Sequence, residues 1–171
     1  DNKWSRIGKK ISEVLSLIKG DHYRSKFINK LVNGVFNSKI KDSTSNNDWI
    51  CTDKKIVKDF DKDPLCGFTF TVNGFCSLFD LMNKVYSKKG WELINDKLPI
   101  WFISGEEDPC MGSKKKFLNA VNLLKEVGYK NVRYKIYSKM RHEILNEKDR
   151  EKVFKDISDK IEEWESHLKN K

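Results

Sequence analysis

The 171-residue sequence has no apolar run close to the ~20 residues that a membrane-spanning helix requires. Its first residues, Asp1-Asn2-Lys3-Trp4, lack the apolar segment of a signal peptide. The sequence also lacks an initiating methionine, so we expect it to begin inside a longer chain. At most, a peripheral contact with a membrane surface is expected.

Cysteine is scarce and unpatterned. The four cysteines form no C-x-x-C pair and have no histidine at metal-ligand spacing: Cys51, Cys66, Cys76 and Cys110. This argues against a zinc site and against a disulfide framework. Unpatterned thiols in a lysine-rich chain are typical of a reducing compartment, so we expect a cytoplasmic protein with no metal and no other cofactor.

Arginine is also scarce, although the formal net charge is +9. Lysines are spread along the whole chain and alternate with acids, as in the run from Glu147 to Lys152, which is typical of a solvated helix face. The sequence contains no arginine-dense recognition helix and no RNA-binding signature. We therefore expect no nucleic-acid partner.

The first 97 residues predict helices. Apolar residues recur at helical spacing between positions 7 and 18, 23 and 35, and 75 and 85. Asp53 is placed to cap a short helix through Phe60, and Asp63-Pro64 ends it because a residue before proline avoids the helical region. The polar stretch 41–48 predicts a surface loop.

The pattern changes after Lys97. The continuous apolar run Leu98–Ile103 predicts a strand buried on both faces, and Val132–Tyr137 alternates like a strand nearer a sheet edge. A helix is expected between them, ending at Gly128, and another from Val153 onward. This order predicts an α/β fold with parallel strands. Because two strands do not make a stable sheet, we expect further parallel strands to precede Asp1 in the intact protein.

Polar loops follow both predicted strands. The first is Ser104-Gly105-Glu106-Glu107-Asp108-Pro109, and the second is Lys139-Met140-Arg141-His142-Glu143. The carboxyl ends of neighbouring parallel strands meet at one sheet edge, where sites form in open α/β sheets. An acid on one loop and His142 on the other are suited to form the acid–histidine half of a catalytic triad. Glu106, Glu107 and Asp108 are the candidate acids of this loop.

The segment G-x-x-D-P after an apolar strand, followed by R-H-E-I-L-N-E before the last helix, resembles the acid and histidine motifs of α/β-hydrolase serine esterases. The nearest branch is the lysophospholipase and monoacylglycerol-lipase-like enzymes, also called serine aminopeptidases. Segments 47–49 and 63–68 are similar to that branch too. The resemblance implies a helical cap over residues 1–97 and the C-terminal strand–helix–strand–helix part of the hydrolase core over residues 98–171. It implies that Asp108 is the triad acid and His142 the general base.

The chain departs from that family in one large respect. None of its nine glycines belongs to a G-x-S-x-G nucleophile motif, and the oxyanion loop that precedes the motif is absent as well. The sequence therefore predicts the C-terminal part of a serine hydrolase that cleaves carboxylic esters, and we expect lipid-like substrates. We expect the chain alone to be inactive and the N-terminal half of the same fold to be its partner. The alternative is a helical interaction module without an active site.

Apolar side chains of the expected cap are candidates to line an acyl-chain tunnel: Phe70, Phe75, Phe79 and Met82. The simpler interpretation of a stripe at helical spacing is core packing, and both interpretations stand at the level of sequence.

Overall fold

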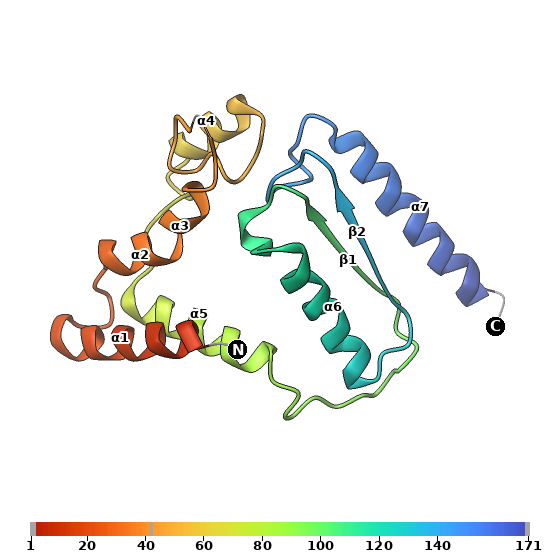
Figure 1. Cartoon of the computed structure of the whole chain (residues 1–171), viewed down its shortest axis with the longest axis horizontal. Coiled ribbons are helices and arrows are strands. Elements are labelled where there is room, and N and C mark those ends of the chain that lie inside the picture. The colour runs from red at the N-terminus through yellow and green to blue at the C-terminus, as the bar shows by residue number, and fades with distance from the viewer. Residues whose placement is uncertain (1–2, 42, 170–171) are drawn as a thin grey trace.

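The computed structural model describes residues 3–41 and 43–169. Within these residues, five helices come first and a strand–helix–strand–helix unit follows, joined to them by an extended segment (Figure 1). The helices of the first part are α1 (Lys3–Lys19), α2 (Lys26–Val32), α3 (Gly34–Asn37), α4 (Lys54–Lys62) and α5 (Val72–Val85). The second part comprises β1 (Ile100–Gly105), the short 3-10 turn η1 (Pro109–Met111), α6 (Lys114–Val127), β2 (Val132–Tyr137) and α7 (Arg150–Lys169).

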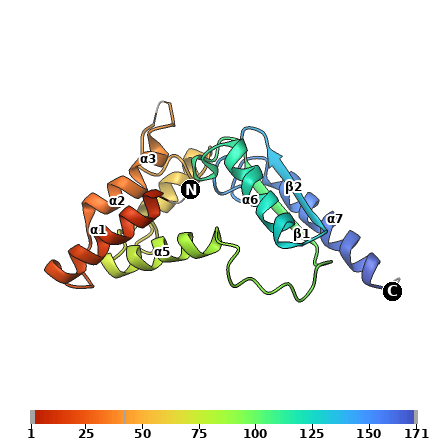
Figure 2. The same ribbon diagram turned by 60° about the horizontal axis from the view of Figure 1, so that its bottom comes forward.

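The two strands pair in parallel, as the sequence predicts. Their register runs from Ile100 opposite Val132 to Gly105 opposite Tyr137. Helices α6 and α7 cover opposite faces of this pair (Figures 1 and 2). On the α6 face, the Phe117 ring meets Phe102 and Tyr134 edge-on. On the α7 face, Val153 is completely buried in a cluster with Tyr137, Met140 and Ile144.

Strand β1 differs from the expectation in position and in burial. It begins two residues later than predicted, at Ile100, and it includes Ser104 and Gly105, which the sequence assigned to a turn. Its side chains from Ile100 to Ser104 are half-buried rather than buried on both faces. The reason is that β1 has one neighbouring strand in the described part of the chain, so its other edge lacks a partner. A parallel sheet this small is marginal in water.

The helical part has its own small core. Helix α1 packs along α5 (Figures 1 and 2), and Ile28, Val72, Phe75 and Phe79 form a buried cluster between the helices. A methyl group at Gly8 would lie 2.5 Å from Cζ of the Phe79 ring, so glycine at this position allows α1 to approach the ring closely.

The predicted helix ends are confirmed around α4. The Asp53 side chain accepts a hydrogen bond from the backbone amide of Lys55 at 2.9 Å, which caps the helix at its start. The helix ends at Lys62, one residue before the Asp63-Pro64 pair. The stretch predicted as one helix through Val35 is divided at Asn33 into α2 and α3.

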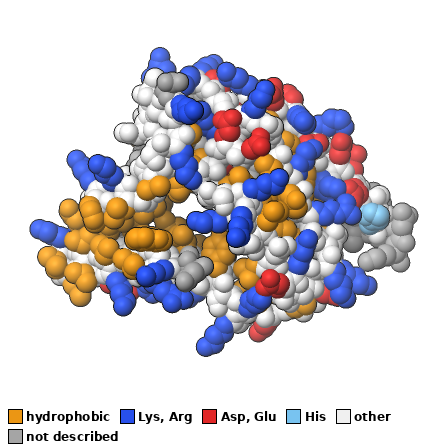
Figure 3. All heavy atoms as spheres, viewed as in Figure 1, with side chains coloured by type: hydrophobic (Ala, Val, Ile, Leu, Met, Phe, Trp, Pro, Cys, Tyr) orange, Lys and Arg blue, Asp and Glu red, His pale blue; other side chains and the backbone are white. Residues whose placement is uncertain are grey.

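Much of the apolar surface of α1 and α2 is uncovered. Figure 3 shows hydrophobic side chains gathered over this side of the molecule. Trp4, Leu17 and Ile18 are 82%, 89% and 68% exposed. On the following segment Phe27, Leu31 and Val35 are also more than half exposed. Helices of a closed domain bury such stripes, so these faces lack their cover in the part of the chain that the structure describes.

Among the described residues, no helix combines the length and apolar character needed to cross a bilayer.

Candidate active site

The loops that follow β1 and β2 are held together by backbone hydrogen bonds. The amide of Glu106 donates to the Tyr137 carbonyl at 2.8 Å, and the amide of Glu107 donates to the Met140 carbonyl at 2.9 Å. A methyl group at Gly105 would lie 2.2 Å from the Arg141 carbonyl oxygen and 2.3 Å from that of Met140. Only glycine therefore lets the second loop cross the end of β1 at this distance.

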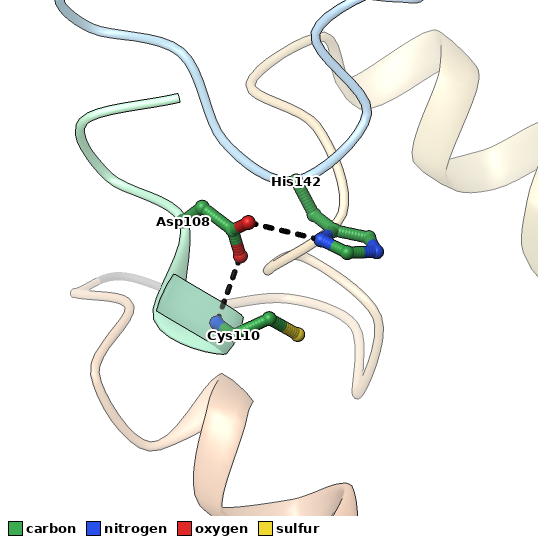
Figure 4. A group of neighbouring side chains, drawn as sticks. All are labelled: Asp108, Cys110 and His142. Carbon is green, nitrogen blue, oxygen red and sulfur yellow. Dashed lines mark hydrogen bonds and ion pairs between the residues drawn. The ribbon is translucent and has the colours of Figure 1, made fainter. Parts of the chain in front are cut away.

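This crossing brings Asp108 and His142 together, although they are 34 residues apart in sequence. Oδ2 of Asp108 lies 3.0 Å from Nδ1 of His142 (Figure 4). The other carboxylate oxygen, Oδ1, accepts a hydrogen bond from the Cys110 backbone amide at 2.8 Å, which fixes the carboxylate at the start of η1. The Asp108 side chain is 9% exposed and the His142 side chain 44% exposed, so the carboxylate is sheltered and the ring is open.

The imidazole is held in one orientation by this contact. With Asp108 accepting at Nδ1, the ring directs Nε2 away from the carboxylate (Figure 4). Hydrogen bonding to Asp108, and secondarily to Cys110, raises the pKa of His142 to about 10, although burial of the ring acts in the opposite direction. Both partners therefore favour the imidazolium form, and the ring can accept a proton only from its neutral form, which predominates above this pKa.

The alternative acids have other partners. Oε2 of Glu106 accepts a hydrogen bond from the Ser138 hydroxyl at 2.7 Å. Oε2 of Glu107 lies 3.9 Å from Nε of Arg141. Of the three acids in this loop, Asp108 is the one in contact with His142.

The residues on both sides of His142 are anchored to the loop between α3 and α4. Arg141 donates from Nη1 to the Asp48 carbonyl at 2.6 Å and to the Cys51 carbonyl at 3.2 Å. The Glu143 amide donates to the Ile50 carbonyl at 2.7 Å. The helical part of the chain thus contributes to the position of the imidazole.

Glu147 completes this anchor and corrects an expectation from the sequence. It belongs to the charged run predicted to be a solvated helix face, yet it is 1% exposed and precedes α7. Its Oε1 accepts hydrogen bonds from the backbone amides of Thr52 at 3.0 Å and Arg141 at 2.8 Å, and its Oε2 accepts one from the Thr52 hydroxyl. Because these donors satisfy both oxygens of the carboxylate, their hydrogen bonds offset the cost of burying Glu147.

Asp48 and Trp49 shape the opposite side of the site. Burial acts to raise the pKa of Asp48, but hydrogen bonds from Lys54 and from the backbone amides of Ser45 and Thr44 outweigh it and hold the pKa well below its usual range. The next residue, Trp49, places its indole ring 5.1 Å from the His142 ring, measured between centroids. An ionised Asp48 therefore fixes the loop from which Trp49 reaches the imidazole.

The four candidate substrate-contacting residues occupy different environments. Phe70 lines a hollow of about 810 Å³, together with Trp49, Phe60 and Phe68 and several asparagines from α2, α3 and the following loop. Phe75 and Phe79 are 1% and 7% exposed in the core cluster between α1 and α5, and Met82 is 38% exposed on α5. Of the four, Phe70 is the one that lines this hollow, and Trp49 connects the hollow to His142.

A second hollow, of about 740 Å³, lies beside the acid. It is bordered by Asp108, Glu106, Glu107 and Arg141, and by lysines including Lys39 and Lys114. Charged groups of both signs surround it, whereas aromatic rings and asparagines form most of the wall of the hollow next to Trp49.

Cys110 was not identified as a site residue from the sequence. Its side chain lies beside the His142 ring (Figure 4), and ligand atoms of Asp108, Cys110 and His142 all lie within 4.8 Å of one another. The sequence feature that could have pointed to Cys110 is its position two residues after Asp108, the predicted acid. Sequence spacing did not reveal the contact because the histidine comes from the other strand.

Comparisons with known proteins agree with this architecture. A family model described as serine aminopeptidase, S33, matches residues 14–149. The structure is similar to that of a highly thermostable carboxyl esterase from Bacillus coagulans in complex with glycerol, with a TM-score of 0.81, 24% identity, and coverage of 92% of this chain and 52% of the esterase. It is also similar to a lipase in an open form, with a TM-score of 0.64, 19% identity, and coverage of 84% and 46%. A search of curated proteins found no match.

The chain spans about half the length of these two solved structures. The family model covers the helical segment from Val14 onward, both parallel strands, and the two loops that carry Asp108 and His142. The chain therefore belongs to the serine aminopeptidase family of α/β-hydrolases and corresponds to the C-terminal portion of that fold.

Proposed function

We propose that this chain supplies the acid and the base of a serine hydrolase that cleaves carboxylic esters. The observation that carries the proposal is the 3.0 Å contact between Asp108 and His142 at the carboxyl ends of two neighbouring parallel strands. The serine nucleophile and the oxyanion-binding amides come from a segment outside this chain.

In the proposed reaction, the serine hydroxyl attacks the ester carbonyl and its proton passes to Nε2 of His142. The imidazolium then gives this proton to the departing alcohol, leaving an acyl-serine. Water attacks the acyl group in a second cycle, in which Nε2 takes a proton from the water and returns it to the serine. Asp108 accepts the Nδ1 hydrogen bond throughout, which fixes the tautomer and stabilises the imidazolium.

The N-terminal half of the same fold is the proposed partner. Two uncovered surfaces support it: the free edge of β1 and the exposed apolar faces of α1 and α2. Additional parallel strands would pair with the free edge of β1, and the helices that connect them would cover more of its two faces, as its apolar sequence requires. In this arrangement residues 1–97 form a helical cap and residues 98–171 the C-terminal part of the core.

We propose lipid-like esters as substrates, of the lysophospholipid or monoacylglycerol type. Four aromatic rings in the wall of the hollow next to Trp49, including that of Phe70, support an apolar acyl group. The burial of Phe75 and Phe79 supports a role for them beneath that wall, in the packing of α5. Four free cysteines support a reducing compartment such as the cytoplasm.

The test uses the longer protein that contains this chain and its nucleophile segment. Hydrolysis of monoacylglycerol and of short nitrophenyl esters is measured for the unaltered protein and for Asp108→Asn and His142→Ala. Each variant is expected to lose roughly 10⁴-fold in kcat with a smaller change in KM.

Glu106→Gln is the matched control, because Glu106 lies in the same loop and contacts Ser138 instead of His142. It is expected to retain activity within a few fold. Unchanged turnover in His142→Ala, or a longer protein that has no serine nucleophile, would contradict the proposal and favour an interaction module.

A further inference from the structure

We propose that Asp108, Cys110 and His142 form a binding site for a thiophilic divalent cation, represented by Zn²⁺. The three residues provide one carboxylate oxygen, one sulfur and one ring nitrogen, and these atoms lie within 4.8 Å of one another. Two of them belong to η1 and the residue before it, and the third comes from the loop after β2 (Figure 4).

The donor set matches the coordination chemistry of zinc. Zinc binds thiolate, imidazole and carboxylate ligands in tetrahedral geometry, and sites with three protein ligands keep a fourth position for water. Cys110 and His142 are both exposed, so solvent has access to the fourth position. The carboxylate is already held in place by the Cys110 amide, which limits the rearrangement that binding requires.

The cation takes the place of the proton between Asp108 and His142. The Cys110 thiol loses its proton on coordination. Nδ1 exchanges its proton for the metal, and the neutral imidazole then carries its single proton on Nε2. Starting from the neutral ring, one proton leaves the protein for each cation bound; starting from imidazolium, two protons leave.

This exchange has a consequence for catalysis that rests on the proposed function. A ring with metal on Nδ1 and hydrogen on Nε2 has no free lone pair to accept the serine proton. The metal-bound dyad is therefore inactive as a base, and cation binding is an inhibitory switch on the site. Cys110 is the residue that distinguishes this site from an ordinary aspartate–histidine pair.

Binding is tested on the 171-residue chain without any substrate. The chain, freshly reduced, is titrated with Co²⁺, and the near-ultraviolet charge-transfer absorption of a cobalt–thiolate bond is recorded. We expect saturation at one equivalent, displacement of the signal by Zn²⁺, and loss of the signal in Cys110→Ser and in His142→Ala.

Cys76→Ser is the matched control, since Cys76 lies on α5 within the helical part, next to α1 rather than the dyad. This variant is expected to bind like the unaltered chain. Far-UV circular dichroism confirms that each variant is folded. Absence of the thiolate band in the unaltered chain, or its persistence in folded Cys110→Ser, would overturn the metal site; neither result depends on esterase turnover.

Discussion

At the scale of single residues, the Asp108–His142 contact determines the charge of the site. The aspartate raises the pKa of His142 from 6.5 to about 10, with a further contribution from Cys110. We expect Asp108→Asn to return the pKa of His142 toward 6.5 and Cys110→Ser to lower it by a smaller amount. NMR titration of the imidazole resonances measures both effects, and Glu106→Gln is expected to leave the pKa unchanged.

The same shift links stability to pH. Because the pKa of His142 is raised in the folded chain, its contact with Asp108 contributes its full stabilisation of the fold below pH 6.5. This stabilisation is lost as the pH rises through about 10. The free energy of unfolding of the unaltered chain should therefore approach that of Asp108→Asn at high pH. A constant difference between the two from pH 6 to pH 10.5, measured by urea unfolding, would contradict this linkage.

Gly105 is a second residue on which the site depends. In Gly105→Ala the new methyl group would overlap backbone carbonyls of Met140 and Arg141, which cannot rotate away as a side chain would. We expect a loss of about 2 kcal/mol in the free energy of unfolding, and a fall in the pKa of His142 as the loops separate.

Gly34→Ala is the control for this substitution. Its methyl group would meet the flexible Lys30 side chain at 3.3 Å, and the residue lies in α3. We expect it to keep the pKa of His142 and to change stability little. If Gly105→Ala behaved like this control, close crossing of the loops would not be needed for the dyad.

Sequence reasoning found part of this residue-level picture. Asp108 and His142 could be paired because both follow strands whose carboxyl ends meet. The contact with Cys110 depends on the direction of a side chain in a short turn, which position alone does not specify. The burial of Glu147 was also missed, because a charged residue in an alternating run reads as solvated until its donors, Thr52 and Arg141, are known.

At the scale of elements, the loop from Met140 to Glu147 is positioned by the helical part of the chain. Glu147→Ala removes the acceptor of the Thr52 and Arg141 amides and leaves buried donors unpaired, at a cost of about 3 kcal/mol. We expect the pKa of His142 to fall along with stability, because the Arg141 amide loses the acceptor that ties this loop to Thr52. Thermal unfolding and imidazole titration measure the two effects.

Two further variants separate positioning from general destabilisation. Glu147→Gln keeps an oxygen acceptor and is expected to restore most of the His142 pKa. Glu151→Ala removes an acid from the exposed face of α7 and is expected to change neither quantity. A normal His142 pKa in folded Glu147→Ala would show that the loop holds its position without this anchor.

Helices and strands themselves were largely predictable. Their order and the ends of β2, α4 and α6 follow from apolar periodicity and capping residues. The extent of β1 was not, because Ser104 and Gly105 look like turn residues while their backbone continues the ladder with Ile136 and Tyr137. The burial of β1 was overestimated, because its apolar sequence suits a strand in the middle of a larger sheet. In the described part of the chain β1 has one neighbouring strand.

At the scale of the whole molecule, the chain carries the proposed acid and base without the G-x-S-x-G nucleophile motif. We expect no measurable turnover of nitrophenyl esters by the 171-residue chain and no labelling by a fluorophosphonate. The nucleophile and the oxyanion donors supply most of the catalytic effect in this chemistry, and neither is replaced by His142 alone.

Activity in the isolated chain would contradict this expectation if it disappeared on substitution of His142 or of one of the chain's own serines. Activity that is unaffected by any of these changes would indicate a contaminating esterase. Restoration of turnover on mixing with the N-terminal half would support the proposed partnership.

The position of Trp49 gives the molecule an optical readout. Its indole lies 5.1 Å from the His142 ring, close enough for a positively charged imidazole to quench its fluorescence on contact. The fluorescence intensity of Trp49 should rise when the His142 imidazolium loses its proton. Trp49→Phe would remove that change, while the other four tryptophans remain as background. The protonation state of His142 can thus be followed with light, without any substrate.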